Sequence, residues 1–201
     1  KEWGLIDGSK LYDNAVWDIV SYNNSLFVAT SNGINEISII NNMVLPDSKE
    51  IFKAFSNRNI FDLELNSYYL YIASDLGLFR IDLRENNVTT LSNKIIKRIH
   101  LNEFDLTGSN GSLWVYKSNQ EEFITSKIQN YDICGSFIWN SNYQNHVTLL
   151  DTITSKSWVY NQEDGIHGNK IFDVNCDNEW VWFLTNKGIS FFNWSRYHKI
   201  N

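Results

Sequence analysis

The sequence KIFDV at residues 170–174, followed by VWFLT at 181–185 and GISFF at 188–192, decides the fold. It places an Asp between apolar residues, then a continuous apolar run, then a Gly that opens another run. Apolar runs of this length that are rich in aromatic and β-branched residues are typical of strands covered on both faces. The stretch therefore predicts consecutive strands of a buried sheet.

Two further copies of this pattern lie near the start of the chain. VWDI at 16–19 leads to LFVAT and Gly33, and IFDL at 60–63 leads to LYIAS and Gly77. The spacing from Asp to Gly is identical in the three copies: 33 − 18 = 15, 77 − 62 = 15 and 188 − 173 = 15. Such ungapped recurrence indicates a repeat architecture.

The number of repeats follows from their spacing. Trp17 and Phe172 occupy equivalent positions 155 residues apart, and the first step, 61 − 17, is 44. Four steps of about 39 residues fit four-stranded propeller blades, which are roughly 40–50 residues long. We therefore predict an all-β protein, a single β-propeller domain over 1–201 with five four-stranded blades. The blades lie near 14–56, 57–92, 94–127, 128–161 and 169–194 plus 1–6.

Closure of the ring is predicted from the N-terminus. Residues 1–19 match 156–174 at a constant offset of 155, so residues 2–6 can supply the outer strand of the last blade. This would protect the edges that an open sheet exposes. The alternative is an open fragment of a larger propeller, with residues 196–201 as a stub of a fourth strand.

Within the blades, turn residues and apolar runs predict the strands. The first blade is expected at 16–22, 25–31, 33–40 and 49–56, and the second at 60–66, 69–74, 77–83 and 87–91. In the third, Phe104-Asp105-Leu106 imitates the repeat, but 95–101 is an extra strand-like run before it. In the fourth, strands are expected at 137–139, 146–151 and 157–160.

Composition limits the function classes. The chain has one Pro but eight Trp, ten Tyr and twelve Phe, as expected for sheets. A net charge of −6 argues against a nucleic-acid partner, which attracts clustered Lys and Arg. There is no apolar run of the roughly 20 residues that span a bilayer, so we expect no membrane insertion. The lack of a signal-peptide pattern fits a cytoplasmic protein, a processed chain or an excised domain.

Catalytic and cofactor motifs are missing from the sequence. It contains no HExxH, P-loop, GxGxxG after a strand, or GxSxG, and its four His residues lack metal-ligand spacing. We therefore expect no enzyme activity and no cofactor. Cys134 and Cys176 lie in apolar strand-like runs and are expected to be buried free thiols.

The repeated acidic and aromatic residues call for a structural explanation. Asp18, Asp62 and Asp173 recur on the innermost strands, and we expect each to accept a hydrogen bond from the backbone of a neighbouring blade. A cation site or catalytic carboxylates formed by these three residues are the alternatives. Trp17, Phe61 and Phe172 are expected to pack between blades.

Ligand-binding residues are expected in the loops at one mouth of the channel. The candidates are Tyr12, Asn14, Arg58, His167 and Asn169. Tyr12 and Trp194 are aromatic candidates that the repeat does not explain. These loops are polar and rich in Asn, which suits a protein or glycan held by many modest hydrogen bonds.

The C-terminal repeat resembles a known family. The sequences KSWVY at 156–160, DGI at 164–166 and NKIFD at 169–173, with Trp182 and Gly188-Ile189, look like two-component regulator propeller repeats. The resemblance extends over 1–40, 57–91 and 156–193. It implies a propeller in an extracytoplasmic sensor half of a bacterial hybrid histidine kinase, or in a related bacterial surface protein.

Three function classes remain open at this point. The first is a non-catalytic binding or scaffold domain, a sensory or assembly module in the periplasm or outside the cell, with a cytoplasmic location still open. The second is a carbohydrate-active enzyme, a glycoside hydrolase or lyase with acidic residues in the channel mouth. The third is a structural subunit of a larger complex, which would expose a broad apolar patch.

Overall fold

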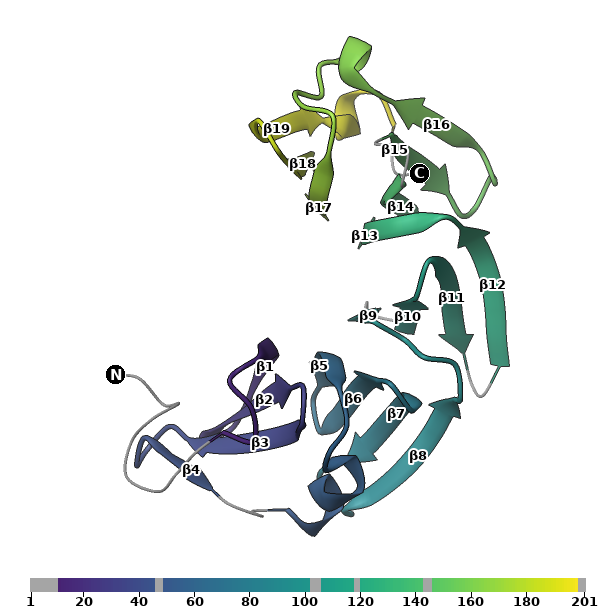
Figure 1. Ribbon diagram of the computed structural model, residues 1–201. Helices are drawn as coiled ribbons and strands as arrows, with labels where there is room; N and C mark the ends of the chain where they lie inside the picture. The colour runs from purple at the N-terminus through teal and green to yellow at the C-terminus, as the bar shows by residue number, and fades with distance from the viewer. Residues whose placement is uncertain (1–10, 46–48, 102–105, 118–119, 143–145, 199–201) are drawn as a thin grey trace. The chain divides into compact units, whose positions relative to one another are not determined.

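A computed structural model of the 201-residue chain describes residues 11–45, 49–101, 106–117, 120–142 and 146–198. The chain divides into two compact units, Lys1–Asn110 with Trp114–Phe123, and Gly111–Leu113 with Ile124–Asn201. Both units are built from antiparallel sheets of sequentially adjacent strands (Figure 1). The expectation that residues 1–201 form one domain stays a prediction.

The first sheet has the order β1-β2-β3-β4. Its strands are β1 (Val16–Tyr22), β2 (Ser25–Thr30), β3 (Gly33–Ser38) and β4 (Met43–Leu45). The first three confirm the prediction, but the fourth strand predicted at 49–56 is wrong. Residues Glu50–Phe55 form the 3₁₀ helix η1, because Phe52 and Phe55, three residues apart, fall on one side and are both buried.

The second sheet matches its prediction closely. It consists of β5 (Ile60–Asn66), β6 (Tyr69–Ser74), β7 (Gly77–Asp82) and β8 (Asn87–Ser92), in that order. Its apolar residues share a core with the first sheet. In this core, Ala29 and Ile34 belong to the same cluster of buried side chains as Ile60 and Leu63. The two sheets therefore pack face against face.

The third sheet contributes strands to both units and has the order β12-β11-β10-β9. Its strands are β9 (Arg98–Leu101), β10 (Leu106–Ser109), β11 (Ser112–Lys117) and β12 (Gln120–Ser126), within the predicted 94–127. The strand-like run at 95–101 is thus the first strand of the blade. Leu106 begins the second strand, while residues 104 and 105 lie outside the described residues.

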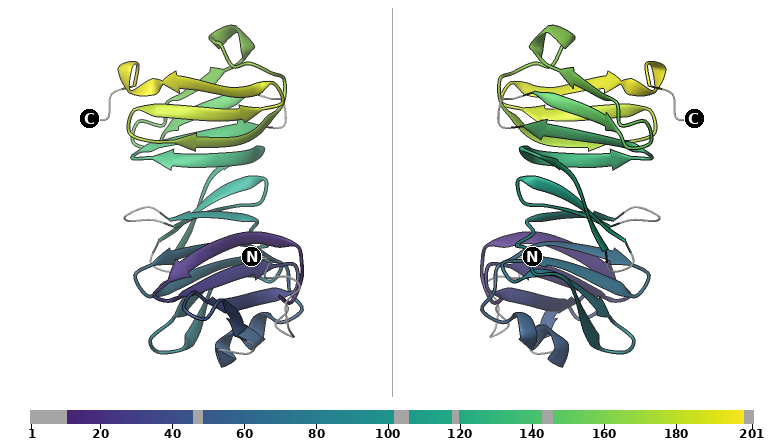
Figure 2. Two further views of the ribbon diagram at one scale, coloured as in Figure 1. Left: turned by 90° about the vertical axis from the view of Figure 1, so that its left-hand side faces the viewer. Right: turned by 90° about the vertical axis from the view of Figure 1, so that its right-hand side faces the viewer.

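The second unit holds two further sheets, shown from two sides in Figure 2. One is β13 (Ile128–Cys134), β14 (Phe137–Asn142), β15 (Val147–Asp151) and β16 (Ser157–Tyr160), and its last three strands overlap those predicted at 137–139, 146–151 and 157–160. The other is β17 (Ile171–Cys176), β18 (Trp180–Thr185) and β19 (Gly188–Asn193). Short 3₁₀ helices lie at Gln162–Asp164 (η2) and Trp194–Arg196 (η3).

The predicted closure falls on residues 1–6, which lie outside the described residues, as do 199–201 of the predicted C-terminal stub. The described part of that stub is not a strand, because η3 ends at Arg196 and Tyr197 caps it.

The prediction that both Cys residues are free thiols is wrong. Cys134 and Cys176 form a disulfide, since each is the last residue of the first strand of neighbouring sheets.

The first strands of neighbouring sheets lie next to each other within each unit. β1 contacts β5, β5 contacts β9, and in the second unit β13 contacts β17. Antiparallel sheets stacked in this way are blades of the β-propeller type. In the described residues four sheets have the predicted four strands, and the sheet β17-β18-β19 has three. We refer to the sheets as blades A to E in chain order.

A β-bulge recurs near the start of four first strands. The register of pairing shifts between Val16 and Asp18, between Ile60 and Asp62, and between Ile171 and Asp173. Trp17, Phe61 and Phe172 are therefore the extra residues of equivalent bulges. Blade D carries the same bulge at Gln129. The repeat equivalence predicted for the three aromatic residues is confirmed at the level of the backbone.

Candidate functional site

The loops at one end of the blades are held in place by a repeated turn. In blade A, Thr30 Oγ1 donates to the carbonyl of Gly33 at 2.8 Å and accepts from the N–H of Asn32 at 3.1 Å. Blades B and E repeat both contacts through Ser74 and Thr185. The hydroxyl thus satisfies the backbone of the turn internally and fixes the conformation of its tip.

A second contact joins this turn to the loop that leads into the blade. The N–H of Ser31 donates to Ala15 at 3.2 Å. The equivalent bonds join Asp75 to Asn59 and Asn186 to Lys170, both at 3.1 Å. The turn between the second and third strands therefore lies next to the loop that enters the blade in blades A, B and E. We call these paired loops the mouth loops: residues 11–15 with 31–32, 57–59 with 75–76, and 163–170 with 186–187.

The five predicted ligand-binding residues occupy only two positions of the repeat. Asn14, Arg58 and Asn169 are equivalent, because 58 − 14 = 44 and 169 − 14 = 155. Tyr12 and His167 are also equivalent, with 167 − 12 = 155. The backbone thus presents different side chains at matched places in successive blades.

In the first unit, the mouth loops carry Tyr12, Asn14 and Arg58. The N–H of Tyr12 donates to Asn35 Oδ1 at 2.8 Å, and its carbonyl accepts from Asn32 Nδ2 at 3.3 Å. These bonds fix the backbone while leaving part of the ring exposed. Asn14 and Arg58 are exposed.

In the second unit, the mouth loop carries His167 and Asn169, both exposed. The N–H of His167 donates to Ser190 Oγ at 2.9 Å. Asn169 pairs with Asn186 twice: its Oδ1 accepts from Asn186 Nδ2 at 2.8 Å, and its N–H donates to Asn186 Oδ1 at 3.1 Å. The pair gives this loop a fixed amide surface.

The expected packing of the bulged aromatics between blades is wrong for two of them. Trp17 is 57% exposed and Phe172 is 45% exposed, whereas Phe61 is half-buried. Trp17 Nε1 donates to Ser31 Oγ at 2.9 Å, which anchors the indole to its mouth loop. The Lys170 ammonium lies 5.1 Å from the Phe172 ring centroid. Sequence reasoning missed these exposed rings because repetition alone favoured packing.

Trp194, the other predicted aromatic candidate, is unavailable to a ligand. Its side chain is fully buried, and Nε1 donates to the carbonyl of Asp177 at 2.9 Å. It packs edge-on against Phe137 and Trp139 in the core of the second unit. Its role is therefore structural.

Two of the three repeated Asp residues, Asp18 and Asp62, join neighbouring blades, as predicted. Asp18 Oδ2 accepts from the N–H of Leu63 at 3.0 Å, and Asp62 Oδ2 accepts from the N–H of Ile99 at 2.8 Å. Each carboxylate thus satisfies a backbone donor of the next blade. We call these bonds interblade carboxylate contacts. For Asp173 the same role stays a prediction.

Blade D makes its interblade carboxylate contact two residues further along. Asp132 Oδ2 accepts from the N–H of Cys176 in blade E at 2.7 Å. Asn130, which follows the bulge as Asp18 does, instead donates its Nδ2 to the carbonyl of Phe172 at 2.7 Å. The disulfide between Cys134 and Cys176 reinforces the same interface.

The Asp62 carboxyl has a raised pKa. Burial, opposed by the hydrogen bond from Ile99, raises its pKa to about 7, and the nearby carboxylates of Asp18 and Glu64 add to the shift. Among the described residues, no group of three His, Cys, Asp or Glu side chains could hold a metal ion. Asp18 and Asp62 lie in the first unit and Asp173 in the second.

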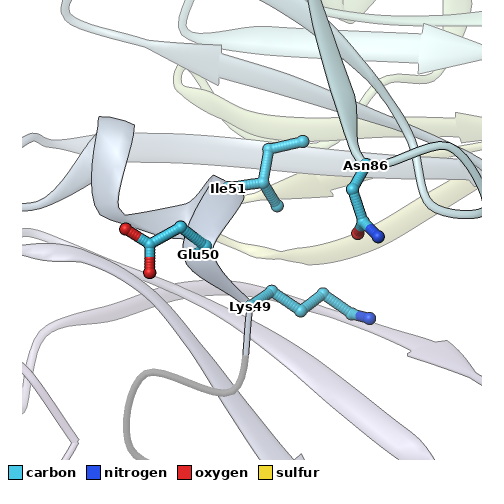
Figure 3. Close-up of a pocket in the computed structure, with 4 residues that line it drawn as sticks. All are labelled: Lys49, Glu50, Ile51 and Asn86. Carbon is cyan, nitrogen blue, oxygen red and sulfur yellow. The ribbon is translucent and has the colours of Figure 1, made fainter.

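A hollow of about 400 Å³ lies in the first unit. It is lined by Lys49, Glu50 and Ile51, at the start of η1, and by Asn86 in the β7–β8 turn (Figure 3). Of these side chains, Glu50 is already paired with Lys53 at 2.6 Å.

Comparisons with known proteins place the fold. No family model and no curated protein matches the sequence. Among solved structures, the chain is similar to the extracellular domains of two putative regulators from B. thetaiotaomicron, the one component system BT4673 and the hybrid two component system BT3049. For BT4673 the TM-score is 0.71 at 14% identity over 92% of this chain; for BT3049 it is 0.71 at 19% over 92%.

A third similar structure is PorZ, a surface component of the type-IX secretion system of Porphyromonas gingivalis, with a TM-score of 0.56 at 15% identity over 91% of this chain. This chain spans 27–28% of the length of each of the three. The resemblance noted in the sequence is thereby confirmed at the level of the fold, which is that of β-propeller blades. No helix in the described part of the chain is long and apolar enough to cross a membrane.

Proposed function

We propose that this chain is a non-catalytic binding or scaffold module of the β-propeller type, acting in the periplasm or outside the cell. Its mouth loops recognise a protein or a glycan. The observation that carries the proposal is that the repeated carboxylates accept backbone hydrogen bonds from the next blade. A hydrolase would instead need two carboxyls directed at a shared substrate pocket.

Two further observations support a location outside the cytoplasm. The similar structures include extracellular domains of regulators and a bacterial surface component. The Cys134–Cys176 disulfide is independent of that similarity, since disulfides persist mainly in oxidising compartments.

The mouth loops suit a glycan or a polar protein surface. They present amides and the exposed ring of Trp17, whose indole N–H is already bonded to Ser31. An exposed aromatic face beside fixed polar groups can stack on an apolar surface while the amides accept and donate hydrogen bonds. Many modest contacts of this kind favour recognition over chemistry.

A carbohydrate-active enzyme is the second candidate, because Asp62 carries a raised pKa next to Asp18. One experiment separates the two functions. The purified chain is applied to a bacterial glycan array and incubated with every glycan that it retains, and released sugars are measured. We expect retention without turnover.

Matched variants test where the ligand binds. Trp17→Ala and Arg58→Ala should weaken binding at least tenfold, whereas Arg196→Ala, an exposed cation on η3, should leave it unchanged. Product release that disappears in Asp62→Asn would establish the enzyme instead. Binding that none of the mouth-loop substitutions alters would place the site elsewhere.

A further inference from the structure

The chain that follows blade E returns to the fourth strand of blade D, β16. After η3, the N–H of His198 donates to the carbonyl of Trp194 at 2.9 Å. The His198 ring lies against Tyr160 of β16, whose hydroxyl is 2.6 Å from the imidazole Nε2. Blades D and E belong to the same unit, so this contact fastens the end of one sheet to the last strand of its neighbour.

The His198 side chain is buried among aromatic rings. It is 9% exposed, and its ring centroid lies 4.4 Å from that of Trp158 and 6.2 Å from that of Phe137. In the described part of the chain, the imidazole has one hydrogen-bonding partner, the Tyr160 hydroxyl. An imidazole in these surroundings has no carboxylate beside it to balance a positive charge, and burying an unpaired charge is costly.

The elements that touch His198 carry few titratable groups. β14 has none, β16 has Tyr160, and η3 with the residue after it has the exposed Arg196 and Tyr197. Asp164 of η2 acts on Tyr160, where it adds to the effect of burial and raises the pKa of the phenol. Burial lowers the pKa of His198 from its ordinary value of 6.5, because the apolar rings disfavour the imidazolium.

We propose that His198 is an acid-sensitive latch, which holds the residues after Trp194 on blade D and releases them when its imidazole takes up a proton. The released segment binds the proton more readily than the latched one, because water solvates the imidazolium and the aromatic rings do not. With the pKa lowered in the latched form, latching is strongest above pH 6.5 and weakens as pH falls below it. Release uncovers the rings of Trp158 and Phe137 in the second unit.

Amide hydrogen exchange of the full chain at pH 7.5 and pH 5, corrected for the intrinsic rate at each pH, tests the latch. The N–H of His198 should lose protection at least threefold at pH 5, while the amide of Val181 in β18 keeps its protection. The lower pH is still above the range in which Asp151, whose pKa the Thr154 hydroxyl lowers, takes up a proton.

Three variants separate the latch from other effects of acid. His198→Gln can still bond to the Tyr160 hydroxyl but does not titrate, so protection at position 198 should no longer depend on pH. Tyr160→Phe leaves the imidazole buried without its hydrogen bond, so it should lower protection at pH 7.5 and keep the pH dependence. His146→Gln is the matched control, because His146 precedes β15 and lies outside this aromatic cluster, and it should respond as the wild type does.

Four results would overturn the latch. The first is equal wild-type protection of the His198 amide at both pH values, and the second is a pH dependence that persists in His198→Gln. The third is a parallel loss of protection at Val181, which would show that the whole unit unfolds. The fourth needs no variant: titration of the His198 ring by NMR should give a pKa below 6.5, and a value at or above 6.5 contradicts the proposal.

Discussion

Asp62 Oδ2 accepts a hydrogen bond from the backbone N–H of Ile99 at 2.8 Å, across the boundary between blades B and C. The residues are 37 positions apart in the chain, and the bond pairs a half-buried carboxylate with the backbone of a buried residue. Ile99 lies on β9, the first and outermost strand of its sheet, so its N–H has no neighbouring strand to bond. The Asp62 carboxylate supplies the acceptor instead. The same logic joins Asp18 to Leu63 and Asp132 to Cys176.

The raised pKa of Asp62 predicts a pH dependence of stability. Its folded pKa is about 7, against 3.8 as the ordinary value, so the folded chain binds more protons between these limits. The free energy of unfolding should therefore fall as pH rises from about 4 to 7, by up to about 1.4 kcal/mol per pKa unit. Urea unfolding at pH 5 and pH 8 measures this change.

The matched variant for this pH effect is Asp62→Asn, which resembles the protonated acid and keeps an acceptor for Ile99. It should flatten the decline between pH 5 and pH 8. Asp18 and Glu64 are neighbours of this position in both proteins. Equal slopes for the wild type and Asp62→Asn would show that another group is responsible.

The disulfide should stabilise the second unit. Cys134 and Cys176 are separated by 42 residues, and cross-links of this kind contribute about 2–4 kcal/mol, mainly by restricting the unfolded chain. Adding a reductant should lower the urea midpoint, while the Cys134→Ser/Cys176→Ser double variant should not respond to it. Two titratable thiols in the native, unreduced protein would contradict the assignment.

Two equivalent glycines separate backbone strain from close packing between neighbouring strands of one blade. Gly77 has φ +134°, and a Cβ there would overlap the carbonyl oxygen of Ser92; Gly188 has φ +113° and no atom within 4 Å of such a Cβ. Gly188→Ala should cost only the strain of a left-handed backbone, about 1–3 kcal/mol. Gly77→Ala should cost clearly more, as measured by thermal unfolding. Equal costs would show that the approach of Ser92 is unimportant.

The sequence predicted those parts of the fold that the repeat specifies. The Asp-to-Gly spacing located blade B in full and the first three strands of blades A and E. The 3₁₀ helix η1 was missed because Ile51, Phe52 and Phe55 were interpreted as a strand, although the three-residue spacing of the two Phe residues indicates a 3₁₀ turn. In blade C, Phe104-Asp105-Leu106 imitated the repeat, while the alternation at 98–101 was the better signal.

The candidate site was less predictable for a physical reason. The mouth-loop positions could be found because turns lie at fixed places in the repeat, and the role of Asp18 and Asp62 followed from their repetition. Exposure of Trp17 depends on which faces are covered, which no local pattern encodes. The disulfide was missed because spacing of 42 residues carries no signal until both Cys residues are placed at the ends of adjacent first strands.

Amide hydrogen exchange at Ile99 tests most directly whether the repeated carboxylates serve the fold rather than catalysis. In the wild type we expect the Ile99 N–H to be protected by Asp62, and in Asp62→Ala we expect its exchange to accelerate at least tenfold. The amide of Val181, in the second unit, should be unaffected. Unchanged protection of Ile99 in Asp62→Ala would contradict a structural role for this carboxylate and reopen a catalytic one.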